Sequence, residues 1–410
     1  MRILQLTPGT GNFHCGGCLR DNALVRALRA RGHDVLMVPL YLPIVAETAP
    51  ETGDTPIFLS GISVFLERKL RVPRWLDRAF SSAAMLRFCS GFAHLTTAKD
   101  LGESAVAMLT GAPPELERLL EWLRTEPRFD VICLSNSLLT GMARRLKEEL
   151  RAPLVATMQG EDSFLDGLTE PYRSRSWELL AQRCADVDRF IAVSRYFADL
   201  MRARLNLPAD RINVIHNGIA LEGFSPAAMP PSVPTVGFLS RMHYGKGLGL
   251  LADAFAELNI PNARLRVAGA MTNADKPLVA SVRRKLGNRV EFLPNIERDA
   301  KIAFLQSLNV LSVPTLYAEA FGLYVLESLA CAVPVVQPRH GAFPELIAAT
   351  GGGLLCDPND AHSLAAALRE LLTDTERARR LGQAGRGTVR ENFSVEKMAQ
   401  RIEAVLASAR

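Results

Sequence analysis

Short apolar segments alternate with amphipathic segments along nearly all of the 410-residue chain. The segment Phe-Ile-Ala-Val at 190–193 is apolar in every position, as strands buried on both faces are. Regular alternation of such strands with helices is typical of a mostly parallel sheet with helices on both sides. The sequence therefore predicts an α/β fold with doubly wound sheets. The expected strands span 3–7, 34–38, 130–134, 154–157, 190–193, 212–215, 236–239, 265–268, 290–293, 310–313, 334–336 and 353–355.

A proline-rich segment divides this pattern into two halves. Residues 225–234 contain four prolines, which cannot continue a helix or a central strand. The strand–helix order starts again after them. We therefore expect a first domain at 1–226, a linker at 227–234, a second domain at 235–392 and a final helix within 393–410.

The composition fits packed domains better than a nucleic-acid-binding or membrane-spanning protein. Apolar residues make up 48% of the chain, and the net charge of +5 is mild. The long uncharged run 302–318 contains Gln306, Asn309 and Pro314, so it predicts the end of a helix and a buried strand. Seven cysteines and an N-terminus without a signal-peptide core lead us to expect reduced thiols in a cytoplasmic protein.

Residues 62–92 interrupt the alternation with a basic, amphipathic insertion. Its basic side chains lie among large apolar ones and are Arg68, Lys69, Arg71, Arg74, Arg78 and Arg87. Peripheral contact with an anionic membrane, on its inner face, is one interpretation. A helical cap with a solvated basic face is the other, and both stay open.

A glycine-rich turn follows the first expected strand and contains Gly16 and Gly17, ahead of a helix expected at 19–31. Such turns let backbone amides approach a phosphate. The spacing does not match G-x-G-x-x-G, and no acidic residue closes the second strand, so a nicotinamide cofactor is not indicated. Cys15 and Cys18 lack the further ligands of a zinc site. They are small residues of a tight turn or, alternatively, a redox pair.

The second half carries two cations in one loop. Arg241 and Lys246 follow the strand expected at 236–239, at the edge where doubly wound sheets bind ligands. Two cations held together repel each other unless an anion lies between them, and a diphosphate suits that place. A solvated basic turn is the alternative that this loop alone leaves open.

Two glutamates follow the strand expected at 310–313. A helix is expected to begin near Gly322, which places Glu319 in the loop and Glu327 in an early turn. Free amides at the helix start would face an anion. Glu327 lies in an otherwise apolar stretch, so its carboxylate needs a partner, for which two vicinal ribose hydroxyls are suitable.

Taken together, these motifs resemble the family 4 glycosyltransferases of the GT-B fold. The pair Arg241-x4-Lys246-Gly247 is similar to the diphosphate-binding pair of that family, and Glu319-x7-Glu327 is similar to its E-x7-E motif. The stretches 193–197, 214–219 and 341–346 also resemble family motifs, and the resemblance extends over essentially the whole chain. It implies two Rossmann-like domains that face each other across a cleft, with the final helix crossing back to the first domain.

The resemblance also implies a role for each matching residue. Arg241 and Lys246 would neutralise the diphosphate leaving group, Glu327 would hold the donor ribose, and Glu319 would contact the donor sugar. The remaining donor-binding residues would be Phe321, Gly322 and Leu323 in the second domain and Gly16 and Gly17 in the first. Transfer with retention of anomeric configuration, without a cofactor or a bound metal ion, is what the family implies. Cations and helix amides can stabilise a departing diphosphate as a metal ion does.

One position departs from the family pattern. After the strand expected at 154–157 the family often carries a histidine, whereas this chain has Gln159, which donates a hydrogen bond but is no general acid or base. Gln159 and Asp162 are acceptor-side candidates. Acidic residues are also favoured in the first turn of a helix, so Asp162 has a purely structural alternative.

The sequence therefore predicts a retaining glycosyltransferase that moves a sugar from a UDP- or GDP-type donor to a hydroxyl acceptor. The expected acceptor is a glycan or a lipid-linked compound, as in glycan, glycolipid or cell-envelope polysaccharide synthesis, and no nucleic acid is expected as a partner. The alternatives are a catalytically silent module that binds nucleotide sugars, favoured by Gln159, and a GT-B nucleotide-sugar epimerase.

Overall fold

The computed structural model describes residues 1–9, 16–41, 44, 50–53, 55–56, 98–111, 115–229 and 231–410. These residues form two compact units. One comprises Met1–Ile215 and Met398–Arg410, and the other comprises His216–Lys397. The insertion expected at 62–92, and Cys15 with it, lies outside the described residues.

The sheet of the first unit has six parallel strands in the order β2-β1-β3-β4-β5-β6. From β1 the chain adds β2 on one side and the later strands, beginning with β3, on the other. Doubly wound sheets bind ligands at such a point, where the strand order reverses. The strands are β1 (Arg2–Thr7), β2 (Asp34–Pro39), β3 (Val131–Leu134), β4 (Leu154–Met158), β5 (Arg189–Ala192) and β6 (Ile212–Val214).

The sheet of the second unit is also six-stranded and parallel, in the order β12-β11-β10-β7-β8-β9. Numbered within the unit, this is the strand order of dinucleotide-binding folds, and its reversal lies between β7 and β10. The strands are β7 (Thr235–Leu239), β8 (Arg264–Gly269), β9 (Val290–Pro294), β10 (Val310–Leu311), β11 (Val335–Pro338) and β12 (Gly353–Cys356). Each of the twelve expected strands overlaps one of the observed strands, which confirms the α/β prediction.

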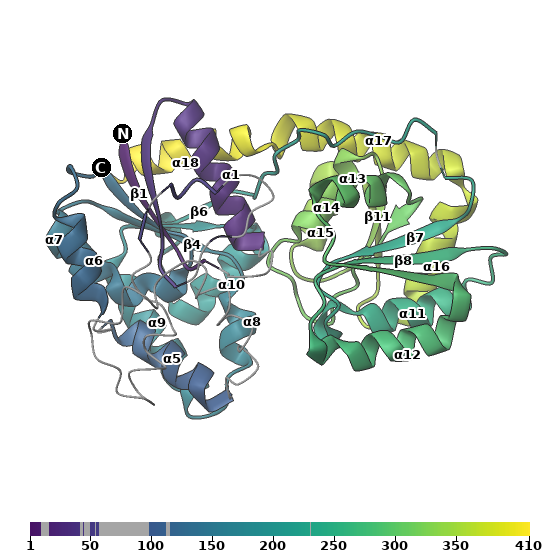
Figure 1. Cartoon of the computed structure of the whole chain (residues 1–410), viewed down its shortest axis with the longest axis horizontal. Coiled ribbons are helices and arrows are strands. Elements are labelled where there is room, and N and C mark those ends of the chain that lie inside the picture. The colour runs from purple at the N-terminus through teal and green to yellow at the C-terminus, as the bar shows by residue number, and fades with distance from the viewer. Residues whose placement is uncertain are drawn as a thin grey trace. The chain divides into compact units, whose positions relative to one another are not determined.

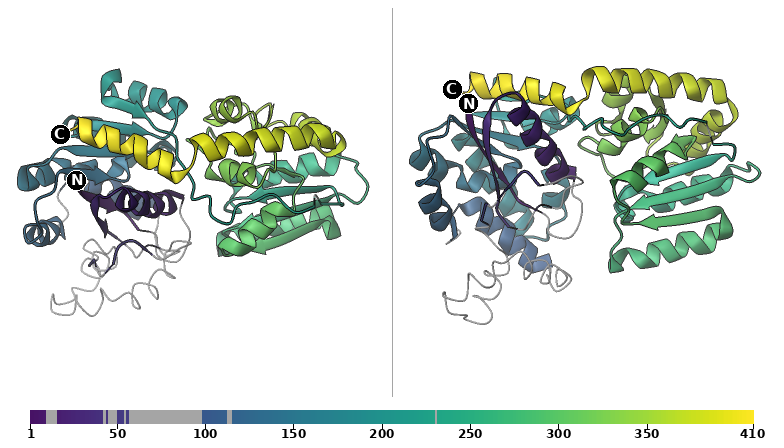
Figure 2. Two further views of the ribbon diagram at one scale, coloured as in Figure 1. Left: turned by 90° about the horizontal axis from the view of Figure 1, so that it is seen from above. Right: turned by 45° about the horizontal axis from the view of Figure 1, so that its top comes forward.

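Helices connect the strands of each sheet. In the first unit they are α1 (Gly16–Ala30), α5 (Ala98–Thr110), α6 (Glu115–Leu123), α7 (Ala143–Leu150), α8 (Glu161–Asp166), α9 (Tyr172–Arg183) and α10 (Arg195–Leu205). In the second unit they are α11 (Leu248–Glu257), α12 (Lys276–Leu286), α13 (Arg298–Gln306), α14 (Leu323–Ala330), α15 (Phe343–Thr350), α16 (Ala361–Thr373) and α17 (Thr375–Asn392). The last helix, α18 (Val395–Ser408), begins in the second unit, and from Met398 on it belongs to the first. In Figure 1, α11 and α12 lie on one side of the second sheet and α14 and α15 on the other. Helix α17 packs against α14 and α15. It is drawn in yellow in the second unit and is seen along its length in the view from above in Figure 2.

The helix ends follow from side-chain chemistry. Ser194 precedes α10, and its hydroxyl accepts a hydrogen bond of 3.1 Å from the amide of Phe197. Asn206 ends the same helix in the left-handed conformation that asparagine tolerates. The start of α1 differs from the sequence expectation, because the helix already includes Gly16 and Gly17 rather than beginning at residue 19. Both glycines therefore lie in its first turn.

The division between the units falls between Ile215 and His216, so the proline-rich segment belongs to the second unit. The residues just before that segment pack within the second unit: the amide of Ile219 donates to the carbonyl of Phe393 at 3.0 Å, and the amide of Val395 donates to that of Ile219. The prolines of the segment prevent regular structure there. The second unit nevertheless begins before the segment, because residues near Ile219 already bond to it.

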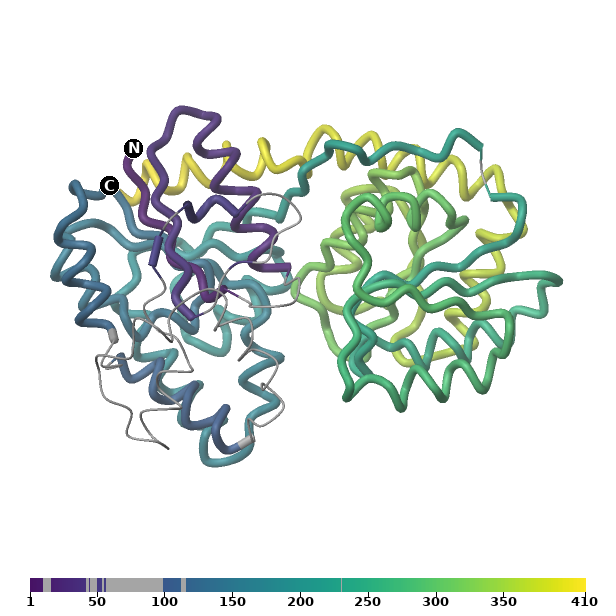
Figure 3. Tube along the Cα trace, in the orientation of Figure 1, coloured from purple at the N-terminus to yellow at the C-terminus, as the bar shows by residue number. Residues whose placement is uncertain are grey.

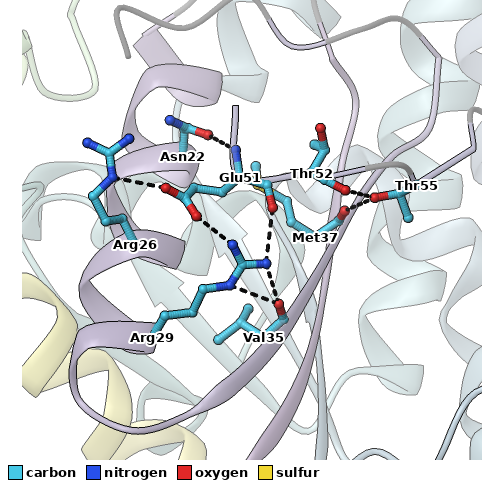
Figure 4. Close-up of polar contacts among 8 residues, drawn as sticks. All are labelled: Asn22, Arg26, Arg29, Val35, Met37, Glu51, Thr52 and Thr55. Carbon is cyan, nitrogen blue, oxygen red and sulfur yellow. Dashed lines mark hydrogen bonds and ion pairs between the residues drawn. The ribbon is translucent and has the colours of Figure 1, made fainter. Parts of the chain in front are cut away.

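Two polar clusters connect the first strands of the first unit to residues distant in sequence. Glu51 accepts hydrogen bonds from Arg26 and Arg29 of α1, and Arg29 also donates to the carbonyl of Val35, as Figure 4 shows. The second cluster joins the chain ends, which Figure 3 shows close together. Asp130 accepts 2.8 Å hydrogen bonds from the amide of Arg2 and the guanidinium of Arg410.

The core of the first sheet generates a stability prediction. Phe190 in β5 is 0% exposed, whereas Phe164 on α8 is 38% exposed. Replacing Phe190 by alanine leaves a cavity, so Phe190→Ala should lower the free energy of unfolding by about 3–5 kcal/mol. The matched control Phe164→Ala should change it by less than about 0.5 kcal/mol. Urea titration of both variants checks this, and equal losses would contradict the described packing.

Candidate functional site

The loops that follow β7 and β10 meet at the reversal point of the second sheet. The amide of Leu316 in the second loop donates to the carbonyl of Gly245 in the first at 2.9 Å. Gly247 has a positive φ of 77°, and a Cβ there would lie only 1.8 Å from the carbonyl oxygen of Pro314. Only glycine allows this approach, so the two loops are locked together by their backbones.

Lys246 and Glu319 form an ion pair across these two loops. The Lys246 ammonium lies 2.5 Å from Oε2 of Glu319 and 5.1 Å from the ring centre of Tyr317. The Tyr324 hydroxyl donates to the same Glu319 oxygen at 3.4 Å. Burial lowers the pKa of Lys246, but the charges of Glu319 and Tyr317 and the hydrogen bonds to both residues together raise it by more, so the pKa lies above its usual value.

Arg241 begins the same loop and has an exposed side chain, which no ion pair or hydrogen bond engages within the described ranges. The expectation of two mutually repelling cations therefore needs refinement. Lys246 already has a counter-charge within the chain, and Arg241 is the cation left to solvent.

The turn after β11 supports the backbone of Glu319. The amide of Ala342 donates to the carbonyl of Glu319 at 2.9 Å. Gly341 has a φ of 60°, and a Cβ there would lie 2.5 Å from the same oxygen. His340 lies beside this turn with Nε2 3.0 Å from the carbonyl oxygen of Thr315, and burial lowers its pKa.

Helix α14 begins as expected. Gly322 precedes it with a φ of 93°, Phe321 is buried, and Leu323 is the first helical residue. In the part of the chain that the structure describes, no backbone acceptor outside the helix is paired with the amides of Gly322 and Leu323. Glu327 lies one turn into the helix, with its Oε1 2.6 Å from the ammonium of Lys301. Glu327 therefore has a partner within the chain, Lys301, in addition to the ribose hydroxyls expected from the sequence.

In the first unit, Gly17 and Gln159 lie side by side. A Cβ on Gly17 would lie 3.1 Å from Nε2 of Gln159, and that nitrogen donates to the carbonyl of Ser135 at 2.6 Å. Ser135 follows β3 and Gln159 follows β4, so the residues meet at the carboxyl edge of the sheet. Gly16 is the exposed first residue of α1.

Glu161 and Asp162 differ in their surroundings. The buried carboxylate of Glu161 accepts hydrogen bonds from the amides of Ser137, Gln159 and Gly160 at 2.8–3.0 Å, so it fixes the turn around Gln159. Asp162 is half-buried, and burial raises its pKa. Burial also raises the pKa of Tyr196, to which the Asp162 charge adds.

A buried ion pair lies beneath the same edge. The guanidinium of Arg20 donates to Oδ1 of Asp21 at 2.8 Å, and both side chains are inaccessible to water. Thr7, at the end of β1, donates to the other oxygen of Asp21. Burial raises the pKa of Asp21, an effect that the Arg20 charge opposes.

The sequence missed Arg20, Asp21, Lys301 and His340. A signal existed for some of them. Asp21 precedes Leu24 and Val25 by three and four residues, so it lies on the apolar stripe of α1. Lys301 precedes Phe304 and Leu305 by the same spacings on α13. A charge on a buried stripe requires a partner. The partner of Asp21 is the adjacent Arg20, whereas Glu327, the partner of Lys301, is 26 residues away and could not be identified from the sequence.

The described residues bear on metal ligation, redox chemistry and membrane spanning. No three His, Cys, Asp or Glu side chains of the described ranges are placed to hold a metal ion. Cys18 is buried, and Cys15, its partner in the alternative redox pair, lies outside the described residues. Among the helices described, none is long and apolar enough to cross a membrane.

The turn at Gly341 generates a second prediction. Gly341→Ala introduces a left-handed alanine and a clash with the Glu319 backbone, so it should lower the free energy of unfolding by more than about 2 kcal/mol. The control Gly387→Ala adds a methyl group to an exposed position of α17 with open space around it, and should raise that free energy by up to about 1 kcal/mol. Changes of the same sign in denaturant titrations would contradict the described turn.

Relatives of the chain are glycosyltransferases. A D-inositol 3-phosphate glycosyltransferase from Mycolicibacterium smegmatis is 29% identical over 237 residues, which are 54% of this chain and 52% of the relative. A glycogen synthase from Mycobacterium tuberculosis is 29% identical over 297 residues, covering 69% of this chain and 70% of that enzyme. The chain spans about half the length of the mycobacterial inositol-phosphate glycosyltransferases that it matches.

Solved structures share the fold over the whole chain. Sucrose-phosphate synthase from Thermosynechococcus elongatus has a TM-score of 0.76 at 20% identity, covering 99% of this chain and 98% of that one. Anabaena HepE in complex with UDP has a TM-score of 0.71 at 17% identity and full coverage of both chains. These similarities confirm the GT-B fold.

Two family models match the chain in succession. The model for Glycosyltransferase Family 4 matches residues 22–222, and the model for Glycosyl transferases group 1 matches residues 225–388. Together they account for both units, in the order that the sequence motifs predicted. The chain therefore belongs to the family 4 glycosyltransferases.

Proposed function

We propose that the chain transfers a sugar, with retention of anomeric configuration, from a nucleotide-diphosphate donor to a hydroxyl acceptor. The observation that carries this proposal is the Lys246–Glu319 pair beside the start of α14, at the reversal point of a dinucleotide-type sheet. Ligands of doubly wound folds bind at this point. The site there offers a cation, a carboxylate and helix amides, which are the groups that a sugar diphosphate requires.

In this proposal each charged residue of the second unit binds a different part of the donor. Arg241, the solvent-exposed cation, and Lys246 stabilise the negative charge that develops on the departing diphosphate. Amides at Gly322 and Leu323 donate to its oxygens, as helix starts do for anions. Glu319 accepts hydrogen bonds from the sugar hydroxyls, and the pair with Lys246 holds its carboxylate in place. Glu327 accepts hydrogen bonds from the ribose.

The carboxyl edge of the first unit is the proposed acceptor side. Gly17 is a proposed donor contact. It lies against the side chain of Gln159, whose amide is held by the Ser135 carbonyl. Asp162, with its pKa raised by burial, is the candidate group for receiving an acceptor proton. The acceptor class that we propose is a glycan or a lipid-linked glycan.

A catalytically silent module is the second candidate, and one observation favours it. Gln159 replaces the histidine expected from the family, and its nitrogen already donates to Ser135 at 2.6 Å. An amide held in this way transfers no proton. Such a module would bind nucleotide sugars without releasing the diphosphate.

A panel of donors decides between the candidates. Purified protein is incubated with UDP-, GDP- and ADP-linked hexoses, beginning with UDP-glucose because HepE has been crystallised with it. Release of free nucleoside diphosphate, measured by a coupled assay, supports the transferase. Tight binding of a donor in calorimetry without turnover, with or without added sugar acceptors, supports the silent module. Binding of no donor contradicts both candidates.

Lys246 provides the mutational test of the leaving-group role. Lys246→Ala removes one preorganised cation, so we expect kcat/KM to fall by the equivalent of about 2–4 kcal/mol of transition-state stabilisation. Lys285→Ala is the matched control, because Lys285 forms an exposed ion pair with Asp253 on the same unit. Thermal melts of both variants show whether they fold. A Lys246→Ala turnover within about threefold of the wild type would contradict the assigned role.

A further inference from the structure

Helices α13 and α14 are joined by an ion pair with unusually little access to water. Lys301 on α13 is only 8% exposed, and its ammonium lies 2.6 Å from Oε1 of Glu327 on α14. The Lys246–Glu319 pair of the same unit is nearly as enclosed, whereas the Lys285–Asp253 pair is exposed. Placing an ammonium in a buried position carries a desolvation penalty that a paired carboxylate offsets.

The surroundings of the Lys301 ammonium direct it toward Glu327. On another side lies the ring of Phe224, whose centre is 5.9 Å from the nitrogen. Phe224 is itself buried, so it limits the positions that the lysine side chain can take. The nearby thiol of Cys331 carries no competing charge, because burial raises its pKa to about 12.

The contact engages only one oxygen of the carboxylate. Lys301 donates to Oε1, and within the described residues no group donates to Oε2 of Glu327. The Glu327 side chain is 16% exposed, and Oε2 is not among the buried, unpartnered oxygens of the described residues, so it keeps contact with solvent. Anchoring Oε1 fixes the plane of the carboxylate and thereby the direction in which Oε2 accepts hydrogen bonds.

We infer that Lys301 is a positioning residue that fixes Glu327 for the vicinal hydroxyls of a ribose and so makes the site select ribose over 2′-deoxyribose nucleotides. The inference rests on the proposed nucleotide-diphosphate donor. A carboxylate held by Lys301 cannot turn away when one hydroxyl is missing, so the deoxy ligand leaves an oxygen desolvated and unpaired. A carboxylate without Lys301 reorients, and the distinction between the two sugars weakens.

The test is the ratio of affinities for UDP and 2′-deoxy-UDP, measured by calorimetry on the full chain. GDP and ADP are run in parallel with their 2′-deoxy forms, in case the site takes another base. We expect wild type to prefer the ribonucleotide by about tenfold or more. Lys301→Met should bring the ratio to within about threefold of unity. The control Lys285→Met should keep the wild-type ratio.

A double-mutant cycle separates positioning from general damage. If Lys301 acts through Glu327, Lys301→Met should change the ratio no further when Glu327→Gln is already present. Lys301→Gln serves as a second single variant if the methionine variant does not fold. A wild-type ratio in a folded Lys301 variant overturns the inference and leaves the proposed function intact. Failure of the wild type to bind any of the diphosphates overturns the proposed function, and this inference with it.

Discussion

The pairing of β7 with β10 is the constraint on which the second unit depends. These strands are neighbours in space although β8 and β9 come between them in the chain. Their carboxyl ends therefore bring two loops together that are about seventy residues apart in sequence, as the ion pair from Lys246 to Glu319 demonstrates. Without this pairing Lys246 would lack its counter-charge, and Gly247 would have no partner at Pro314.

Two little-exposed lysine–glutamate pairs of similar geometry occur in the second unit, beside several more exposed ion pairs. Lys246 pairs with Glu319 in the loops, and Lys301 pairs with Glu327 between two helices. In each pair the lysine belongs to an earlier element and the glutamate to the E-x7-E motif. We propose that the first pair contacts the sugar and the second the ribose, which gives the two glutamates separate tasks.

Much of the fold and part of the site followed from the sequence. Buried parallel strands are apolar throughout, so runs such as 190–193 located all twelve strands. Local motifs likewise placed Glu319 in a loop and Glu327 within the following helix. The ion pairs of the site could not be predicted. Which lysine lies next to Glu319 and which next to Glu327 follows only from the order of the strands in the sheet. The start of α1 and the boundary at Ile215 were also missed, since both depend on packing rather than on local composition.

The locking of the loops after β7 and β10 has a consequence for engineering. A hydrogen bond from Leu316 to Gly245 and the close approach of Gly247 to Pro314 make them a single module. Exchanging one loop for that of a relative would leave an incompatible backbone opposite it. Chimeric enzymes with altered donor preference should therefore import residues 240–247 and 312–322 as a unit, because the compatibility of each loop is defined by the other.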